Sequence, residues 1–308
     1  MIATVTLNPA VDKTYYVEKI ACGEVNRVTE LTSLAGGKGI NVARICAIIG
    51  EDVIASGYIG GNTGRFILES LAEYGIKHDF FRVKGESRTC IAIREKEGGK
   101  VTEFLEPGPT ITPAEITGME EKIIALAKKC KIMVLAGSLP KGTPPEIYQR
   151  FIRIIKKHGA IPILDTSGKA LELGIEGEPY MIKPEAEVQV LLGLKNLSEE
   201  EILTGIKTLQ TKNIPLVVVS LGAKGSLIGW DVDYYRVMPP AIDPVNTVGC
   251  GDSLVAGIAI GISRRYEKEE TIRFATAVSA ANALTPLAAV CRPDDVERLL
   301  PEVRIKKL

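Results

Sequence analysis

The chain has 308 residues, of which 45% are hydrophobic, so it is long enough to form one large domain or two with a substantial core. Lysine plus arginine and aspartate plus glutamate number 38 each, and this balance disfavours nucleic acid as a partner, because such surfaces normally carry a basic excess. The six cysteines are scattered without a C-x-x-C pair, which suits reduced thiols in a cytosol better than disulfides or a zinc site.

Residues 2–7 form a short apolar run that is followed at once by a polar turn containing Asp12. The run is too short, and too soon followed by charge, for a signal peptide, and no apolar run approaches the ~18 residues of a membrane span. We therefore expect a soluble cytoplasmic protein with no membrane partner. Only His78 and His158 are present, so acid–base chemistry must fall to carboxylates rather than to a histidine-based triad.

The first third of the chain is rich in strand-like segments. Residues 2–7 are typical of a strand, and residues 14–20 and 25–33 alternate apolar with polar side chains, as in a half-exposed antiparallel pair. A glycine turn opens a helix that runs to about residue 49. A helix at 63–75 and further strands are expected, the latter at 53–59, 80–83, 89–94 and 101–105. The segments near 13–33 and 88–105 are expected to form a small β lid.

From about residue 112, helices and strands alternate regularly. Strands are predicted at 132–136, 161–165, 180–182 and 215–220, a hairpin at 223–237, and helices at 113–129, 144–158, 186–192, 198–212, 267–284 and 294–300. Such alternation indicates parallel βαβ units with helices on both faces of a buried sheet. We expect residues 1–308 to form one doubly wound α/β domain with a mainly parallel sheet and the small β lid.

Residues 246–253 (NTVGCGDS) precede an uncharged run, residues 254–262, that is typical of a buried helix. Gly249 and Gly251 permit a tight bend and a close approach to a ligand, and the first amides of a helix have no partners within it. The segment therefore predicts an anion hole. Asp252 at this position could take a proton from an attacking hydroxyl, or it could merely cap the helix.

Polar turns follow several of the predicted strands. Because the carboxyl ends of parallel strands meet at one edge of a sheet, where α/β proteins bind ligands, we expect these turns to build one site. The glycines at 36–39 (GGKG) would admit a substrate to bare backbone, with Lys38 and Asn41 holding its oxygens; the alternative is a plain strand-to-helix turn. The other turns are at Asp12, 137–140 (GSLP), 165–168 (DTSG), 183–187 (KPEAE) and 220–225 (SLGAKG).

Four ordered motifs give the chain a specific resemblance that covers almost its whole length. They are TLNPAVD at 6–12, AGGKGINVA at 35–43, GSLP at 137–140 and NTVGCGDS at 246–253. Together they resemble the PfkB (ribokinase-like) sugar kinases, and within that family the branch that acts on phosphosugars. The resemblance implies transfer of the ATP γ-phosphate to a ketohexose phosphate, giving a 1,6-bisphosphate, with Mg²⁺ required.

The resemblance also implies roles for individual residues. Asp252 resembles the catalytic base of the family, and its anion hole corresponds to Gly249, Cys250 and Gly251. Substrate-binding positions correspond to Asp12, Gly37, Lys38, Asn41 and Ser138. Arg27 and Arg88, both on the predicted lid, match arginines that hold the phosphate already on the sugar, a task suited to a forked guanidinium, although either could be a solvated surface charge. Nucleotide-side positions correspond to Lys183, Ser220, Gly222, Gly225, Thr247 and Asn282.

One segment departs from the family pattern. Where the family usually reads K-P-N-x-x-E, whose Asn and Glu organise Mg²⁺ and its waters, this chain reads KPEAEV at 183–188. Glu185 stands in place of the Asn, and Glu187 matches the Glu only if one residue is deleted. Two carboxylates still suit a hard cation, so both are candidate metal-site residues.

The choice of sugar rests on residues 88–93 (RTCIAI) and 105–109 (LEPGP), which resemble the family members that act on tagatose 6-phosphate. Fructose 1-phosphate and then fructose 6-phosphate are the alternatives, because a few contacts worth ~1–3 kcal/mol separate such sugars. In another class, the chain could be a catalytically silent sensor of sugar phosphate or nucleotide, which only the altered 183–187 segment favours. The half-apolar lid strands, with Tyr15, Val17 and Ile20, predict a homodimer through the lid.

Overall fold

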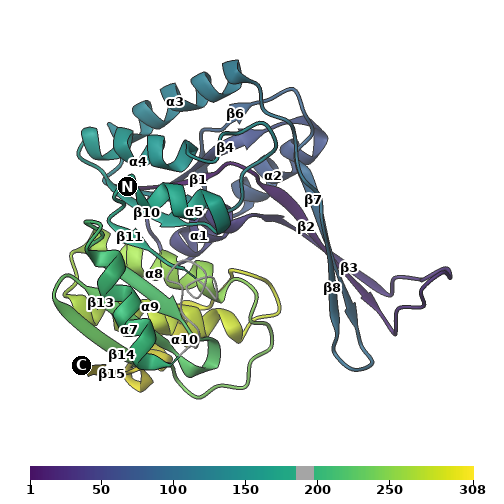
Figure 1. Cartoon of the computed structure of the whole chain (residues 1–308). Helices are drawn as coiled ribbons and strands as arrows, with labels where there is room; N and C mark the ends of the chain where they lie inside the picture. Colours follow the sequence, from purple (N-terminus) through teal and green to yellow (C-terminus); the bar gives the residue numbers. More distant parts are fainter. Residues whose placement is uncertain (185–197) are drawn as a thin grey trace.

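The computed structural model describes residues 1–184 and 198–308 (Figure 1). It is a mixed α/β fold with a large, mostly parallel sheet, helices on both faces, and a small separate sheet. This architecture confirms the expected fold class. The helix expected at 186–192 and the two metal-site candidates, Glu185 and Glu187, lie outside the described residues.

The large sheet is parallel over most of its width and ends in an antiparallel edge. In spatial order its strands are β15 (Arg304–Lys307), β14 (Asp233–Met238), β13 (Ser226–Trp230), β12 (Leu216–Ser220), β11 (Met181–Ile182), β10 (Ile161–Asp165), β9 (Ile132–Ala136), β1 (Ile2–Thr6), β4 (Val53–Ile59) and β5 (Lys77–His78), and β6 (Phe81–Arg82) also pairs with β4. The pairs from β12 to β5 and β6 are parallel. The β12–β13, β13–β14 and β14–β15 pairs are antiparallel.

Helices cover both faces of this sheet, and each face has its own core. One core includes side chains of α1 (Lys38–Ile48), α2 (Gly61–Glu73), α8 (Cys250–Arg264), α9 (Lys268–Ala283) and α10 (Pro293–Leu299), and the other of α3 (Pro113–Ala127), α4 (Ile147–Lys157), α5 (Gly168–Ile175) and α7 (Glu199–Gln210). In β9, Val134 belongs to the first core, while Met133 and Leu135 belong to the second. Burial on both faces explains why this strand is a continuous apolar run.

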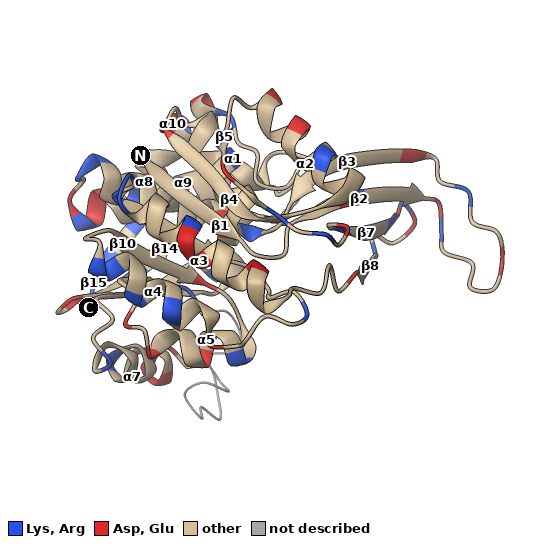
Figure 2. Ribbon diagram, turned by 90° about the horizontal axis from the view of Figure 1, so that it is seen from above, with Lys and Arg blue, Asp and Glu red and all other residues tan. Residues whose placement is uncertain are grey.

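The small sheet has the strand order β3 (Glu30–Gly36), β2 (Ala10–Val17), β7 (Arg88–Glu95) and β8 (Val101–Leu105). The β2–β3 and β7–β8 pairs are antiparallel, whereas β2 and β7 are parallel. Figures 1 and 2 show that this sheet projects from the body of the molecule, with the β2–β3 connection reaching farthest. Its strands come from the two segments that the sequence predicted to form a lid.

The register of the small sheet determines which side chains share a face. Ala10 lies opposite Arg88, Asp12 opposite Cys90, and Tyr16 opposite Arg94. Because alternate residues of a strand point to the same side, Asp12, Arg88 and Arg94 lie on one face of the sheet. The other face carries Tyr15 and its neighbours.

Two strands of the large sheet were missed by the sequence analysis. β15 has the sequence RIKK, and three of its four residues are exposed basic side chains, so neither alternation nor burial marks it as a strand. β5 has only two residues. Both lie at sheet edges, where one neighbour suffices to hold a strand whose own sequence signal is weak. In the described part of the chain, no helix is long and apolar enough to cross a membrane.

Candidate active site

A cavity of about 360 Å³ lies between the inner face of the small sheet and the carboxyl ends of β1, β9 and β10. Polar and charged groups reach it from elements far apart in the sequence, including Thr166 after β10 and Asn246 before α8. Six of the seven residues that the sequence assigned to the substrate line this cavity: Asp12, Gly37, Lys38, Asn41, Arg88 and Ser138. Several of the polar turns therefore meet at one edge of the sheet, as expected, and line this cavity.

The glycine turn before α1 is shaped by the lack of side chains. A Cβ on Gly36 would lie 1.8 Å from Asp12 Oδ2, so only glycine leaves room for that carboxylate. Gly37 has a φ of 106°, a conformation that L side chains rarely adopt. The turn lets α1 begin directly beside the cavity, with Lys38 in its first turn and Asn41 one turn further on.

The turn before α8 is built in the same way. Gly249 has a φ of 83°, and a Cβ there would lie 2.5 Å from the backbone nitrogen of Ala289. The bend brings the first turn of α8, which carries Cys250, Gly251 and Asp252, to the same end of the sheet. Since the first amides of a helix have no acceptor within it and lie at the positive end of its dipole, this turn is suited to an anion.

Asp252 is buried one hydrogen bond behind the cavity. Its Oδ2 accepts a bond of 2.7 Å from Asn41 Nδ2, and Asn41 lines the cavity. Burial, and after it the nearby Asp165, raises the pKa of Asp252 from 3.8 to about 6, while Lys38, the bond from Asn41, and Lys183 act in the opposite direction. A carboxylate with such a pKa is ionised at neutral pH and still basic enough to accept a proton, which suits a general base.

Two lysines meet on the buried carboxylate of Asp165, at the end of β10. Its Oδ1 lies 3.2 Å from Lys38 Nζ and 3.4 Å from Lys183 Nζ. Lys183 is 1% exposed, so a nucleotide contact from its side chain would need the atoms around it to move. Asp165 Oδ2 is buried and has no hydrogen-bond partner among the described residues.

Arg88, at the start of β7, lines the cavity from the small sheet. Its Nε donates to the backbone oxygen of Asn8 and its Nη1 to that of Glu106, both at 3.2 Å. The guanidinium is thereby aligned between β1 and the small sheet with donors still unused. Nearby Asp12 has its pKa raised to about 6 by burial, with Arg88 and Arg44 lowering it and Glu103 raising it. A cation and a carboxylate side by side are suited to a phosphate and to sugar hydroxyls respectively.

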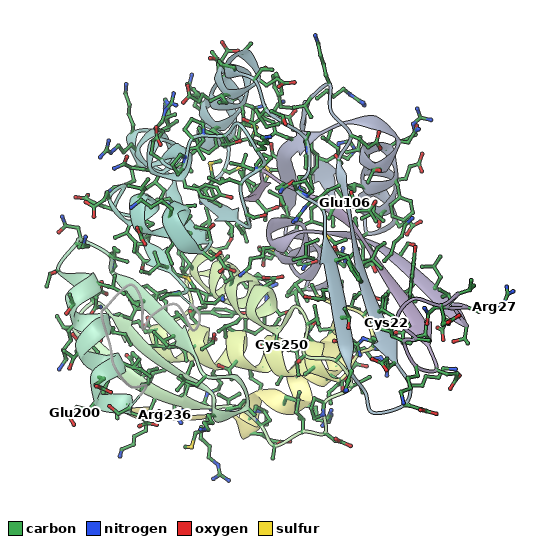
Figure 3. All side chains as sticks on the ribbon, turned by 45° about the vertical axis from the view of Figure 1, so that its right-hand side comes forward. Cys22, Arg27, Glu106, Glu200, Arg236 and Cys250 are labelled. Carbon is green, nitrogen blue, oxygen red and sulfur yellow. The ribbon has the colours of Figure 1, made fainter. Side chains whose placement is uncertain are left out.

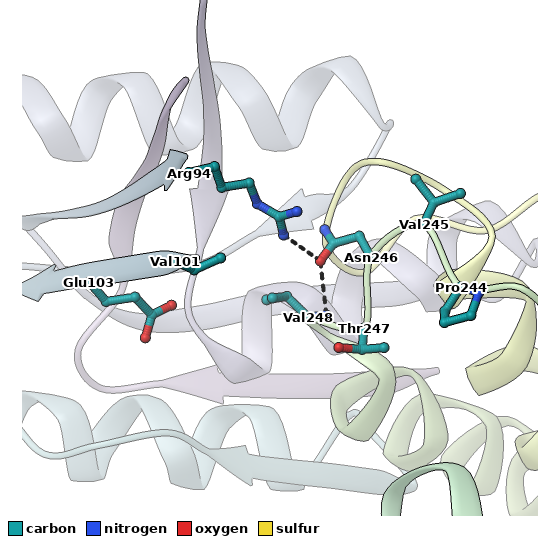
Figure 4. A pocket seen from close by; sticks show the side chains of 8 residues that line it. All are labelled: Arg94, Val101, Glu103, Pro244, Val245, Asn246, Thr247 and Val248. Atoms are coloured by element: carbon teal, nitrogen blue, oxygen red, sulfur yellow. Dashed lines mark hydrogen bonds between the residues drawn. The ribbon is translucent and has the colours of Figure 1, made fainter. Parts of the chain in front are cut away.

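The far end of the small sheet is joined to the turn before α8 by one polar contact, which Figure 4 shows. Arg94 Nη2 donates to Asn246 Oδ1 at 2.8 Å, and the same oxygen accepts the backbone N–H of Val248 at 3.1 Å. Asn246 Nδ2 donates to the backbone oxygen of Pro286. A second, more open hollow of about 530 Å³ lies around this contact and is lined in part by Glu103.

The comparison with protein families agrees with this geometry. Residues 5–295 match the family model described as pfkB family carbohydrate kinase. The chain belongs to the pfkB family. This pfkB kinase is 38% identical over 309 residues to a tagatose-6-phosphate kinase of Staphylococcus epidermidis, with 99% of each chain covered. Its homologues are kinases, so it is a phosphotransferase that acts on a sugar hydroxyl.

Solved structures give the same assignment of fold. Phosphofructokinase-2 from Escherichia coli superposes with a TM-score of 0.92 at 28% identity, with 97% of this chain and 98% of that chain covered. Arabidopsis thaliana ribokinase superposes with a TM-score of 0.80 at 20% identity, again over 97% and 98% of the two chains, and this likeness concerns the fold alone. The pfkB kinase therefore has the ribokinase-like fold.

Arg27 is the one substrate-site candidate that does not line the cavity. It is exposed in the β2–β3 connection, and Figure 3 shows it at the outer end of the small sheet, far from Cys250 at the start of α8. In one copy of the chain, Arg27 and Arg88 thus do not meet. Within the same copy, the second arginine on the cavity face is Arg94.

The nucleotide-side candidates lie in four places, the first of which is Lys183 after β11, beside Asp165. Ser220 ends β12, Gly222 begins the 3₁₀ turn η1 (Gly222–Lys224), and Gly225 follows this turn. Thr247 is exposed in the segment before α8. Asn282, on α9, is fully buried. Its Nδ2 lies 3.1 Å from both the backbone oxygen of Val248 and Cys250 Sγ, so its side chain supports the turn from behind instead of facing a nucleotide.

The sequence analysis did not name several polar residues of this site as functional. Asn246 belongs to the motif at 246–253, but its bonds to both the small sheet and Pro286 follow only from the fold. Asp165 was named only as part of the polar turn at 165–168, and its contacts with Lys38 and Lys183 follow only from the fold. Arg44 lies one helical turn after Asn41 on α1, and its burial and its bond to Asn41 follow only from the fold.

Proposed function

We propose that this pfkB kinase transfers the γ-phosphate of ATP to tagatose 6-phosphate and forms tagatose 1,6-bisphosphate. The observation that carries the proposal is the 38% identity to a tagatose-6-phosphate kinase over 99% of both chains. The cavity supports it, because Arg88 and Ser138 line it and can hold a phosphate already on the sugar, while Asn41 on its wall bonds Asp252.

In the proposed reaction, the sugar hydroxyl loses its proton to Asp252 as its oxygen bonds to the γ-phosphorus and the bond to ADP breaks. The anion hole of Gly249, Cys250 and Gly251, at the start of α8, stabilises the negative charge of the transferred group. Lys38 adds a positive charge from the cavity wall. Asp12 and Asn41 hold the sugar, and the turns at 220–225 and 247 border the nucleotide.

A divalent metal is consistent with an ATP-using kinase family, and we propose that it is Mg²⁺. Within residues 1–184 and 198–308 no three metal-ligating side chains cluster. Mg²⁺ suits such a site, because it usually keeps several waters and takes only one or two carboxylates plus substrate phosphates. Asp165 Oδ2, which has no hydrogen-bond partner among the described residues, supports this proposal, because a carboxylate oxygen is a hard, anionic donor. Glu185 and Glu187 would hold the ion and its waters, and the ion would neutralise phosphate charge.

A panel of acceptors tests the substrate. ADP release, measured by a coupled assay with tagatose 6-phosphate, fructose 6-phosphate, fructose 1-phosphate and ribose, is expected to give the highest kcat/KM for tagatose 6-phosphate. Fructose 1-phosphate and then fructose 6-phosphate are the alternatives, and the second is supported by the solved complex of phosphofructokinase-2 from Escherichia coli with fructose-6-phosphate. The Asp252→Asn enzyme in the same panel reports any contaminating kinase. If none of the phosphorylated sugars led to ADP release, the result would overturn the proposal and favour a sensor.

We also propose that two copies pair through the small sheet, which then acts as a lid. Its outer face carries cross-strand apolar pairs, Tyr15 with Leu31 and Ile91 with Phe104, and Leu31 and Phe104 are 54% and 59% exposed. Sedimentation at micromolar concentration is expected to show a dimer, and Phe104→Asp is expected to weaken it. A monomeric wild-type protein would contradict this. With ATP and a sugar phosphate as substrates and six free thiols, we place the enzyme in the cytoplasm.

A further inference from the structure

A buried cation lies directly beneath the proposed catalytic base. Arg44, on α1, is 1% exposed and lies one helical turn after Asn41. Buried arginines are almost always paired with an anion, yet no carboxylate lies within ion-pair distance of Arg44 among the described residues. Its guanidinium instead faces polar groups of the active site and the ring of Tyr74, 5.5 Å away. Such a costly group needs a specific reason to be present.

The first contact of Arg44 fixes the orientation of a side-chain amide. Arg44 Nη1 donates to Asn41 Oδ1 at 3.1 Å, and Asn41 Nδ2 donates to Asp252 Oδ2 at 2.7 Å. An asparagine amide has one accepting and one donating end, and a half turn exchanges them. Because a guanidinium only donates, the accepting end must face Arg44 and the donating end must face Asp252.

The other contacts tie the backbone around the site to the same cation. Arg44 Nη1 also donates to the backbone oxygen of Ala288 at 3.1 Å, and Nη2 donates to that of Ala35, just before the glycine turn. Ala288 belongs to the loop that packs on Gly249, where an added Cβ would meet Ala289. One guanidinium therefore spans the glycine turn, Asn41 and the loop behind the anion-binding turn.

We propose that Arg44 is a positioning residue for phosphoryl transfer: it orients the Asn41 amide so that Nδ2 faces Asp252 and holds one oxygen of the base. This inference rests on the proposed role of Asp252 as the base. With Oδ2 held, Oδ1 of Asp252 is the oxygen left to meet the acceptor hydroxyl. Without Arg44, the Asn41 amide can turn and present its oxygen to the carboxylate, which removes a donor and adds repulsion.

The charged groups around Asp252 come from three other elements and stay in place when Arg44 is changed. Lys38 lies at the start of α1, Asp165 ends β10, and Lys183 follows β11. Asp252 and Asp12 both interact electrostatically with Arg44. A change at Arg44 therefore affects the proton affinity of Asp252 through the Asn41 amide and through the loss of one positive charge, and a double-mutant cycle separates the two effects.

The experiment measures kcat, KM and the pH profile of kcat for Arg44→Met, Asn41→Ala and the double variant. Arg44→Met is expected to lower kcat roughly 10- to 100-fold, with little change in the KM for ATP. The acid limb of the pH profile of kcat for Arg44→Met is expected to move to higher pH by about one unit. Asn41→Ala alone is expected to reproduce the loss of kcat. In the Asn41→Ala background, adding Arg44→Met is expected to lower kcat by less than about threefold further.

Two further variants keep the test decisive. Arg44→Lys keeps the positive charge and one donating nitrogen, so it is expected to recover part of the lost kcat, and it remains informative if Arg44→Met folds poorly. Arg273→Met is the matched control, because Arg273 also donates to a backbone carbonyl, that of Val303, but does not line the cavity. It is expected to affect stability and leave the pH profile unchanged.

The outcomes separate this inference from the proposed function. Equal costs of Arg44→Met in the wild-type and Asn41→Ala backgrounds, or an acid limb that stays in place, would overturn the positioning role. If Asp252→Asn kept normal turnover, the base assignment would fail instead, whatever Arg44 does. An Arg44 effect confined to melting temperature would show a purely structural cation and would likewise overturn the inference.

Discussion

Arg94 Nη2 and Asn246 Oδ1 are 2.8 Å apart, and this contact joins the small sheet to the turn that begins α8. Asn246 also holds the N–H of Val248 with the same oxygen, so the arginine bonds a group that shapes the turn. The sheet that covers the sugar side of the cavity and the turn that would bind the transferred phosphate are thereby aligned on each other.

Arg94→Leu is expected to raise the KM for the sugar phosphate and to lower kcat, so that kcat/KM falls roughly 5- to 10-fold. The reason is that a partly exposed charged hydrogen bond is worth about 1 kcal/mol. Initial rates at saturating ATP measure this. Arg65→Leu, at an exposed position on α2, is the matched control and is expected to behave as wild type. Wild-type kinetics for Arg94→Leu would show that this contact does not matter for turnover.

Asp252→Asn is expected to lower kcat by roughly 10³-fold or more, since the amide cannot accept the proton of the hydroxyl. Because Asn keeps the size and can still accept the hydrogen bond from Asn41, both substrates are expected to bind with affinities close to those of wild type. Isothermal titration calorimetry measures that binding. Turnover comparable to wild type would remove Asp252 as the base.

The pH dependence of kcat follows from the raised pKa of Asp252. The base works in its ionised form, so kcat is expected to fall as the pH drops below about 6, roughly tenfold per pH unit. Because Lys38 lowers this pKa, Lys38→Met is expected to move the acid limb to higher pH. A profile that stays flat down to pH 4.5 would contradict the pKa assigned to this carboxyl.

Most of the large sheet could be predicted from the sequence, because the local sequence of its central strands is enough to identify them. IMVLA in β9 and IPILD in β10 are apolar runs bounded by turn residues, and the helices between them have their own period. The edge strand β15 could not be predicted in this way, because RIKK owes its conformation to pairing with β14. Information of that kind lies in the neighbour and not in the segment.

The residues of the site likewise divide into those that the local sequence predicts and those that depend on contacts formed only in the fold. Glycines such as Gly36 and Gly249 were predictable, because a turn that must bend sharply or admit another group demands them. The contacts of Arg44 were not, because residues 35, 41 and 288 come together only in the folded chain. Arg27 shows the converse: its motif position suggested a phosphate contact, but the fold carries it out to the tip of the small sheet.

Arg88→Ala is expected to raise the KM for the sugar phosphate by roughly 10- to 100-fold, because it removes a guanidinium from the cavity end proposed to hold the phosphate. The KM for ATP is expected to change less than about threefold. Steady-state kinetics with each substrate varied in turn separate the two. Equal increases in both KM values would point to a general disturbance of the small sheet.

The buried carboxylate of Asp252, the proposed catalytic base, is also expected to reduce stability. A carboxyl whose pKa is 3.8 in the unfolded chain and about 6 in the fold binds its proton more tightly when folded. Between these values the folded state carries more protons, so the free energy of unfolding decreases as the pH rises. At about 1.4 kcal/mol per pH unit, the ionised group reduces the stability at neutral pH by up to about 3 kcal/mol.

Asp252→Asn removes this cost, because an amide has no charge to bury. The variant is expected to melt at a higher temperature than wild type at pH 8, with a difference that shrinks towards pH 4, where the wild-type carboxyl is protonated. Differential scanning calorimetry at both values measures it. Asp52→Asn is the control, because Asp52 is exposed and its pKa is lowered by Lys77, so no gain is expected at pH 8. If Asp252→Asn were stabilised equally at pH 4 and pH 8, the gain would come from packing, and the buried charge of Asp252 would not be what destabilises the wild-type protein.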